Sequence, residues 1–247
     1  MVPYYGRHST KQYIHGKPVR YGYKVWALCT SDGSYVYFEP YCGTFTQVED
    51  YKTIGGQGPN VVLDLAEKSM LVPGSHIFMD NLFTSTALLD ELSRLQIGGT
   101  GTVRQNRLNK IPLKTKKQME HKSTSRGYHE ACYSSDQVIV AWRDNKAVYI
   151  NSNHSGVEPV GSCSRYNRTE RKHVAVPIPR CIVEYNASMG GVDLLDNLVS
   201  CYRYNKIISI FYKANLYCVV GILPSICISI NVSIHLIYIC QTIYLTI

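Results

Sequence analysis

The stretch His76-Ile-Phe-Met-Asp-Asn-Leu-Phe-Thr-Ser85 constrains the fold most, because it joins a buried strand to a helix through a carboxylate. The apolar run 77–79 predicts a short buried strand, and the apolar periodicity of residues 82–95 predicts a helix. A carboxylate at the end of such a strand, here Asp80, lies at the rim of an α/β sheet, where ligands usually bind. The alternative is that Asp80 only caps the helix. The candidate N-caps of that helix are Thr84 and Ser85.

Four further segments show regular patterns. Aromatic and β-branched residues crowd 21–29 and 35–41 around an Asp-Gly turn, which predicts a β-hairpin. A second hairpin is predicted for residues 138–150. After a glycine-rich loop at 43–60, apolar spacing predicts a helix over 61–70. Residues 98–103 predict an edge-like strand.

Charge favours a polyanionic partner. The 247 residues carry 26 Lys and Arg against 18 Asp and Glu, a formal net charge of +8. The nine cysteines show no C-x-x-C pair and no zinc-module spacing, so no metal finger is expected.

Basic residues concentrate in two segments, 104–126 and 163–180. Such runs are often solvated loops, and in a basic chain the competing interpretation is a surface that contacts phosphates. The candidate DNA-binding residues are Arg104, Arg107, Lys110, Lys114, Lys116, Lys117, Arg165, Arg168, Arg171 and Lys172.

A pair of carboxylates follows near the end of the patterned sequence. A helix is predicted through residues 192–199, with Asn186 or Ser188 as its cap. Asp193 and Asp196 stand three residues apart on that helix and project from the same face. The pair would repel without a cation between them. The alternative is that the helix dipole favours acidic residues in the first turns.

The C-terminal residues differ in composition from everything before them. From 214 to 247 there is no Lys, Arg, Asp or Glu. The segment 216–247 is long enough to cross a bilayer, so a membrane anchor is one hypothesis. Its mixed composition favours a second hypothesis, in which the tail is translated from intron or out-of-frame sequence.

Several motifs occur together and in a fixed order. The chain resembles the transposase domain of piggyBac-type elements and of the proteins derived from them, from residue 1 to about 203. The matching stretches are Met1-Val-Pro-Tyr-Tyr-Gly-Arg-His, Gly16-Lys-Pro-Val-Arg-Tyr-Gly-Tyr-Lys-Val-Trp, Phe38-Glu-Pro-Tyr, Met79-Asp-Asn-Leu-Phe-Thr-Ser, Gly99-Thr-Gly-Thr-Val-Arg-Gln-Asn-Arg and Tyr185-Asn-Ala-Ser-Met-Gly-Gly-Val-Asp.

The resemblance implies an α/β fold with an RNase H-like mixed sheet and flanking helices. The expected core comprises 1–106 and 179–203, with an inserted β-containing segment at 107–178 and an aberrant tail at 204–247. The first core strand and the first catalytic aspartate are expected ahead of Met1, outside this chain.

The resemblance also implies a two-metal site for Mg²⁺, a hard cation that prefers oxygen ligands. Asp80 matches the second catalytic and metal-binding aspartate of the family, Asp193 the third, and Asp196 a supporting position one turn further on. With the first aspartate absent, the metal site is expected to be incomplete.

Three functions are weighed on these grounds. The first is a fragment of a transposase-derived protein whose ancestral reaction is metal-dependent DNA cleavage and strand transfer, inactive in this chain. The second is a non-catalytic DNA-binding or interaction protein, and the third a protein anchored in a membrane through 216–247. The resemblance implies DNA, from transposon ends or the genome, as partner, the nucleus as location, and a homodimer for full-length members.

Overall fold

The computed structural model describes residues 1–17, 19–41, 54, 56–108, 111–168, 170–201 and 242–245. The chain divides into two compact units, one of residues 1–195 with 240–247 and one of residues 196–239. Of the second unit only residues 196–201, the end of one helix, are described.

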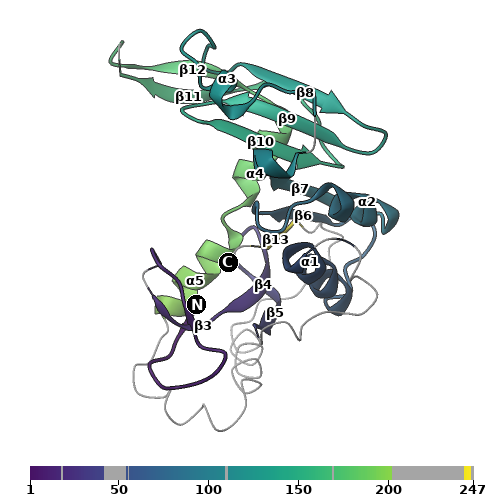
Figure 1. Cartoon of the computed structure of the whole chain (residues 1–247), viewed down its shortest axis with the longest axis vertical. Helices are drawn as coiled ribbons and strands as arrows, with labels where there is room; N and C mark the ends of the chain where they lie inside the picture. Colours follow the sequence, from purple (N-terminus) through teal and green to yellow (C-terminus); the bar gives the residue numbers. More distant parts are fainter. Residues whose placement is uncertain are drawn as a thin grey trace, which may run out of the picture. The chain divides into compact units, whose positions relative to one another are not determined.

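The described residues form helices and strands in mixed order (Figure 1). The strands are β1 (Val2–Pro3), β2 (Gln12–Tyr13), β3 (Tyr21–Tyr23), β4 (Val25–Thr30), β5 (Tyr35–Pro40), β6 (His76–Met79), β7 (Gly98–Thr102), β8 (His129–Tyr133), β9 (Val138–Arg143), β10 (Ala147–Ser152), β11 (Gly161–Asn167), β12 (Lys172–Ile178) and β13 (Thr242–Leu245). The helices are α1 (Gln57–Lys68), α2 (Thr86–Arg94), the 3₁₀ helix η2 (Gln105–Arg107), α3 (Lys116–Met119), α4 (Arg180–Ser188) and α5 (Gly191–Cys201).

An eight-stranded mixed sheet organises the fold, in the order β5-β4-β13-β6-β7-β10-β9-β8. The parallel pair β6 and β7 is connected through α2, and β13 runs parallel to β6 and antiparallel to β4. The position between β4 and β6 is therefore filled by a strand from the far end of the sequence. The resemblance placed the first core strand outside this chain, and β13 supplies a strand at the centre of the sheet.

Alternating side chains of β6 serve two different cores. Ile77 and Met79 are fully buried against apolar residues of α1 and α2. Phe78 faces the other way and packs with Val192 of α5, while Tyr185 of α4 borders the same cluster. Because successive side chains of a strand point to opposite faces, α1 and α2 cover one face and the α4–α5 segment the other.

The segment between β7 and α4 adds strands to this core. Strands β8, β9 and β10 extend the main sheet beyond β7, and β11 and β12 form a two-stranded sheet of their own. Trp142 of β9 is buried in the core they share, and its Nε1 donates to the carbonyl of Pro177 in β12 at 2.8 Å. Near the N-terminus, β1, β3 and β2 form a third, small sheet.

Several predicted elements are present. Both hairpins form, as the antiparallel pairs β4–β5 and β9–β10. Strand β6 ends at Met79, and α2 begins after Ser85, whose side chain accepts a hydrogen bond from the Leu88 amide. Of the two candidate caps, Ser85 is therefore the one used.

Other expectations were wrong. Helix α1 begins at Gln57, inside the predicted loop, because Pro59 is tolerated in a first helical turn that needs no N–H there. Residues 186 and 188 lie inside α4 and cap nothing, since two helices replace the single predicted one. The β11–β12 hairpin and the small N-terminal sheet were not predicted.

Strand β7 is central and not an edge, although three of its five residues are glycines, which pack weakly in strands. A Cβ at Gly99 would come within 2.6 Å of Leu89 Cδ2 of α2, and one at Gly101 would clash with Thr84 and Met79. The glycines are therefore where α2 and its preceding loop approach the sheet most closely.

The C-terminal tail is described only at 242–245, and most of the proposed anchor 216–247 lies outside the described residues. Within the part of the chain that is described, no helix combines the length and the apolarity needed to cross a membrane.

Candidate functional site

Asp80 lies directly after β6, at the carboxyl edge of the parallel strands, as predicted. Its Oδ1 accepts hydrogen bonds from the Asn81 backbone amide at 2.6 Å, from Asn81 Nδ2 at 3.0 Å and from Thr102 Oγ1 at 3.3 Å. These donors fix the carboxylate at the sheet rim, so Asp80 does more than end a strand. The N-cap of α2 is Ser85, which excludes the simple capping alternative for Asp80.

Tyr185 connects this carboxylate to α4. Its hydroxyl lies 3.3 Å from Thr102 Oγ1, the same hydroxyl that donates to Asp80. Burial raises the pKa of Tyr185 to about 12, and the charge of Asp80 acts in the same direction. The phenol therefore stays protonated at neutral pH and remains available as a hydrogen-bond donor.

Asp193 is exposed in the first turn of α5. Its neighbour Val192 is buried with Phe78, so this turn packs on the face of the sheet to which strand alternation also assigns Asp80. A Cβ on Gly33, in the β4–β5 turn, would lie 2.8 Å from Leu194 Cβ, which shows how closely that turn contacts the start of α5. Asp196 is exposed one helical turn further on, where the second unit begins.

Asp80, Asp193 and Asp196 are the carboxylates that the resemblance assigns to a metal site, which it predicts to be incomplete in this chain. Among the residues that the structure describes, no group of three or more His, Cys, Asp or Glu side chains is arranged to hold a metal ion. Two magnesium ions need several oxygen ligands in a common site. The residues present therefore do not fit the two-metal site implied by the resemblance, and no reaction step follows from one here.

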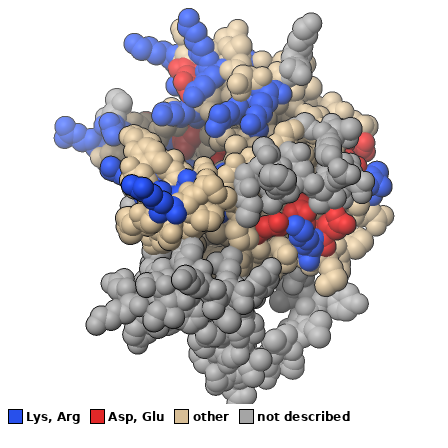
Figure 2. Space-filling view, turned by 60° about the horizontal axis from the view of Figure 1, so that its bottom comes forward, with Lys and Arg blue, Asp and Glu red and all other residues tan. Residues whose placement is uncertain are grey.

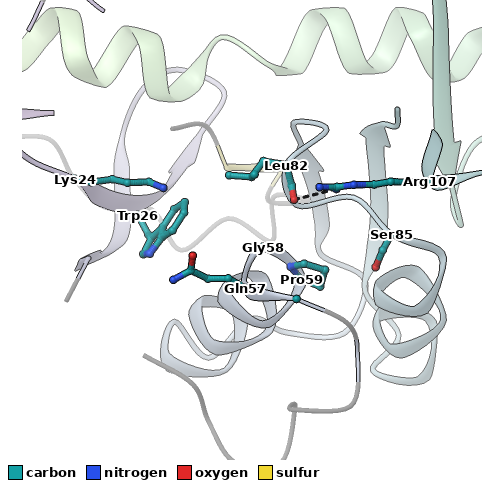
Figure 3. Close-up of a pocket in the computed structure, with 9 residues that line it drawn as sticks. Lys24, Trp26, Gln57, Gly58, Pro59, Leu82, Ser85 and Arg107 are labelled. Carbon is teal, nitrogen blue, oxygen red and sulfur yellow. Dashed lines mark hydrogen bonds between the residues drawn. The ribbon is translucent and has the colours of Figure 1, made fainter. Parts of the chain in front are cut away.

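Two predicted DNA-binding residues contact the loop that follows Asp80. Arg104 Nε donates to Asn81 Oδ1 at 2.8 Å, and Arg107 Nη1 donates to the carbonyl of Asn81 at 2.6 Å. Arg107 Nη1 also donates to the carbonyl of Leu82 at 3.2 Å (Figure 3). Both side chains belong to exposed residues and use neutral acceptors in these contacts. Two positive charges are thus held beside the strand-end carboxylate.

The other predicted basic residues fall into distinct groups. Lys116 and Lys117 are exposed at the start of α3, and Lys114 Nζ lies over the ring of Tyr128, 3.9 Å from its centroid. Arg165 pairs with Asp144 at 3.0 Å and Lys172 with Glu170 at 2.8 Å, so part of this charge is neutralised.

Arg168 and Arg171 are also exposed, and Lys110 lies outside the described residues. Figure 2 shows Lys and Arg side chains gathered on one side of the described surface, with few Asp or Glu among them.

Sequence reasoning missed Thr102 as a donor to Asp80 and Tyr185 as a partner of Thr102. A signal was present for Thr102, because it ends the strand that follows the β6–α2 unit and so reaches the same edge of the sheet. The only signal for Tyr185 was its place in the motif Tyr185-Asn-Ala-Ser-Met-Gly-Gly-Val-Asp. That motif indicated the family and assigned no role to the tyrosine.

Comparison with known proteins identifies the family. The family model described as Transposase IS4 matches residues 1–222. The chain belongs to this transposase family. Human PiggyBac transposable element-derived protein 3 is 39% identical over 210 residues, and human PiggyBac transposable element-derived protein 2 is 34% identical over 204 residues. Each alignment covers 82% of this chain and 34% of the relative, so the chain spans about a third of their length.

A solved structure gives the same family. The cryo-EM structure of the piggyBac transposase synaptic complex with hairpin DNA matches with a TM-score of 0.59 and 27% identity. The match covers 80% of this chain and 38% of that one. The mixed sheet is thus the RNase H-like sheet expected of piggyBac-type transposases.

Proposed function

We propose that this chain is the part of a piggyBac-type, transposase-derived protein that binds DNA across the carboxyl edge of its sheet. The observation that carries the proposal is that Arg104 and Arg107 are fixed against the loop after Asp80. Guanidinium groups suit phosphate oxygens because they offer several donors in one plane. The match to a transposase–DNA complex supports the same partner. Such a role would be exercised in the nucleus.

Asp80 and Asp193 are the candidate remnants of the catalytic centre, with Asp196 in support. The ancestral reaction is cleavage and joining of DNA strands at a pair of metal ions. In this chain the two carboxylates would stand beside bound DNA without completing that centre. Binding, and not strand transfer, is therefore the activity proposed for this chain.

The test compares two arginines. Arg104→Gln removes a charge at the proposed DNA-binding edge, while Arg94→Gln removes the same charge from the end of α2, at the opposite edge of the parallel pair. Arg104→Gln should weaken duplex binding about tenfold, because a charge-assisted hydrogen bond is lost. It should also make the salt dependence of log K less steep by about 0.9, one phosphate contact.

Fluorescence anisotropy with a labelled duplex at several salt concentrations measures both quantities. Arg94→Gln should leave them unchanged. Equal effects of the two substitutions, or affinity that does not depend on salt, would refute binding at this edge.

A further inference from the structure

The small sheet β1-β3-β2, near the N-terminus in Figure 1, gathers tyrosine rings on one face. Tyr13 of β2 lies directly opposite Tyr21 of β3. The Tyr4 amide extends the β1–β3 pairing, because it donates to the carbonyl of Tyr21 at 3.2 Å. Tyr23 follows two positions after Tyr21 along β3. Residues opposite each other, or two apart on one strand, share a face of the sheet, so these tyrosines form one surface, the tyrosine face.

The rings of the tyrosine face pack in pairs and remain open to solvent. The centroids of Tyr13 and Tyr21 are 4.9 Å apart, with a tilt of 42° between the rings. Those of Tyr4 and Tyr23 are also 4.9 Å apart, with a tilt of 38°. Tyr13 is nevertheless 52% exposed and Tyr21 46% exposed. Single exposed aromatic residues are common, whereas several on one face indicate a binding surface, here one whose side chains are already ordered by their neighbours.

Positive charge accompanies this face. Residues 1–31 include no Asp or Glu, and their basic residues are Arg7, Lys11, Lys17, Arg20 and Lys24. Lys11 Nζ lies 5.5 Å from the ring centroid of Tyr21 and donates to the carbonyl of Gly6 at 2.9 Å. Both of these partners are neutral. An anion could therefore pair with this ammonium beside the tyrosine rings.

Aromatic rings next to positive charge suit a nucleic acid strand, because its bases stack on the rings and its phosphates are anionic. The bases must be unpaired, since a duplex keeps the flat faces of its bases inside the helix. Spacing along β3 favours the same ligand. Tyr21 and Tyr23 are separated by about 7 Å of strand, whereas the bases of a helix follow one another every 3.4 Å or so. The rings therefore fit bases that have been drawn apart, as in single strands bound to other small sheets.

We propose that the tyrosine face binds the unpaired bases of a DNA strand, while Lys11 contacts a neighbouring phosphate. The choice of DNA rests on the proposed function. The inference adds to that function a second surface, which takes a single strand and involves neither Asp80 nor Arg104.

A matched pair of substitutions tests the role of the ring. Tyr21→Ile and Tyr21→Phe both keep a large apolar side chain that favours strands, but only phenylalanine keeps an aromatic ring. Fluorescence anisotropy of the full chain with labelled oligothymidylate, which forms no duplex, measures the affinity. Tyr21→Ile should weaken binding about tenfold, the scale of one base–aromatic contact, and Tyr21→Phe should leave it nearly unchanged. Tyr133→Ile, at an exposed tyrosine of β8, should also leave it unchanged.

Two further measurements locate the strand. Lys11→Gln should make the salt dependence of log K less steep by about 0.7, one phosphate contact on a single strand. Oligothymidylate that carries 5-iodouracil, irradiated on the unaltered chain, should form crosslinks to Tyr13 or Tyr21, identified by mass spectrometry of the peptides. The crosslink depends on no variant, so it tests the site even where circular dichroism shows that a substitution disturbs folding.

Equal affinities of Tyr21→Ile and Tyr21→Phe, or crosslinks confined to other segments, would overturn the proposal. Tighter binding of oligouridylate than of oligothymidylate would overturn DNA as the ligand. These results are separable from the fate of the proposed function. Duplex binding that requires Arg104, with no binding of oligothymidylate, rejects the tyrosine face alone. Oligothymidylate binding that requires Tyr21, in a protein that binds no duplex, rejects binding at the sheet edge alone.

Discussion

His76 and His154 lie against each other where β6 begins, with ring centroids 3.6 Å apart. Burial lowers the pKa of His76, and the neighbouring His154 lowers it further, while Glu184 opposes both. A histidine whose pKa is lower in the folded state is protonated more readily after unfolding. Its contribution to stability is complete above the unfolded pKa of about 6.5 and is lost as pH falls below that value.

We therefore predict that the urea midpoint falls between pH 7.5 and pH 5.5, and that His76→Gln reduces this fall. Chemical denaturation at a series of pH values measures both. His129→Gln is the control, since His129 lies in β8 away from this pair. A pH dependence that is the same with and without His76 would show that another group is responsible.

At the scale of single residues, the candidate site was only partly predictable. Asp80 could be found because a strand, a carboxylate and a helix follow one another within ten residues. The contact between Tyr185 and Thr102 joins positions 83 residues apart, and no local pattern encodes it. The pocket lined by Trp26, the start of α1 and Leu82 depends in the same way on packing between distant segments of the chain.

At the scale of elements, local signals predicted hairpins well and sheet positions poorly. The Asp-Gly turn at 32–33 specifies β4–β5 without help from the rest of the chain. The glycines of β7 indicated an edge strand by propensity, yet they serve close packing beneath α2. Tertiary contacts overrode propensity there, as is common for strands.

Strand β13 allows a sharp test of an element. Ile243 pairs with Thr30 on one side and with Ile77 on the other, so it lies in the middle of the sheet. Ile243→Pro removes a backbone N–H from this ladder and should lower the free energy of unfolding by about 3 kcal/mol or more.

The matched control is Ile243→Val, which keeps both the N–H and a β-branched side chain and should cost at most about 1.5 kcal/mol. Urea denaturation followed by circular dichroism compares the two variants. An Ile243→Pro protein with the stability of the unaltered chain would show that β13 does not hold the sheet together.

At the scale of the whole molecule, sequence and fold show the family, and catalysis is a separate prediction. The described residues carry the family's sheet and two candidate catalytic carboxylates, but no group of three metal-binding side chains. We predict no strand transfer on transposon-end DNA with Mg²⁺ or Mn²⁺, assayed by gel electrophoresis of labelled ends. Cleavage that disappears in Asp80→Ala would contradict this, and Asp90→Ala, on α2, controls for contaminating nucleases.

The origin of β13 also has a consequence during biosynthesis. Residues 28–30 and 76–79 leave the ribosome long before residues 242–245, which are paired between them. Chains emerge from the ribosome over seconds, and unpaired strand edges invite association while they wait. Each nascent chain must therefore keep β4 and β6 from pairing elsewhere until residues 242–245 have been synthesised, and chaperones would be most needed during that period.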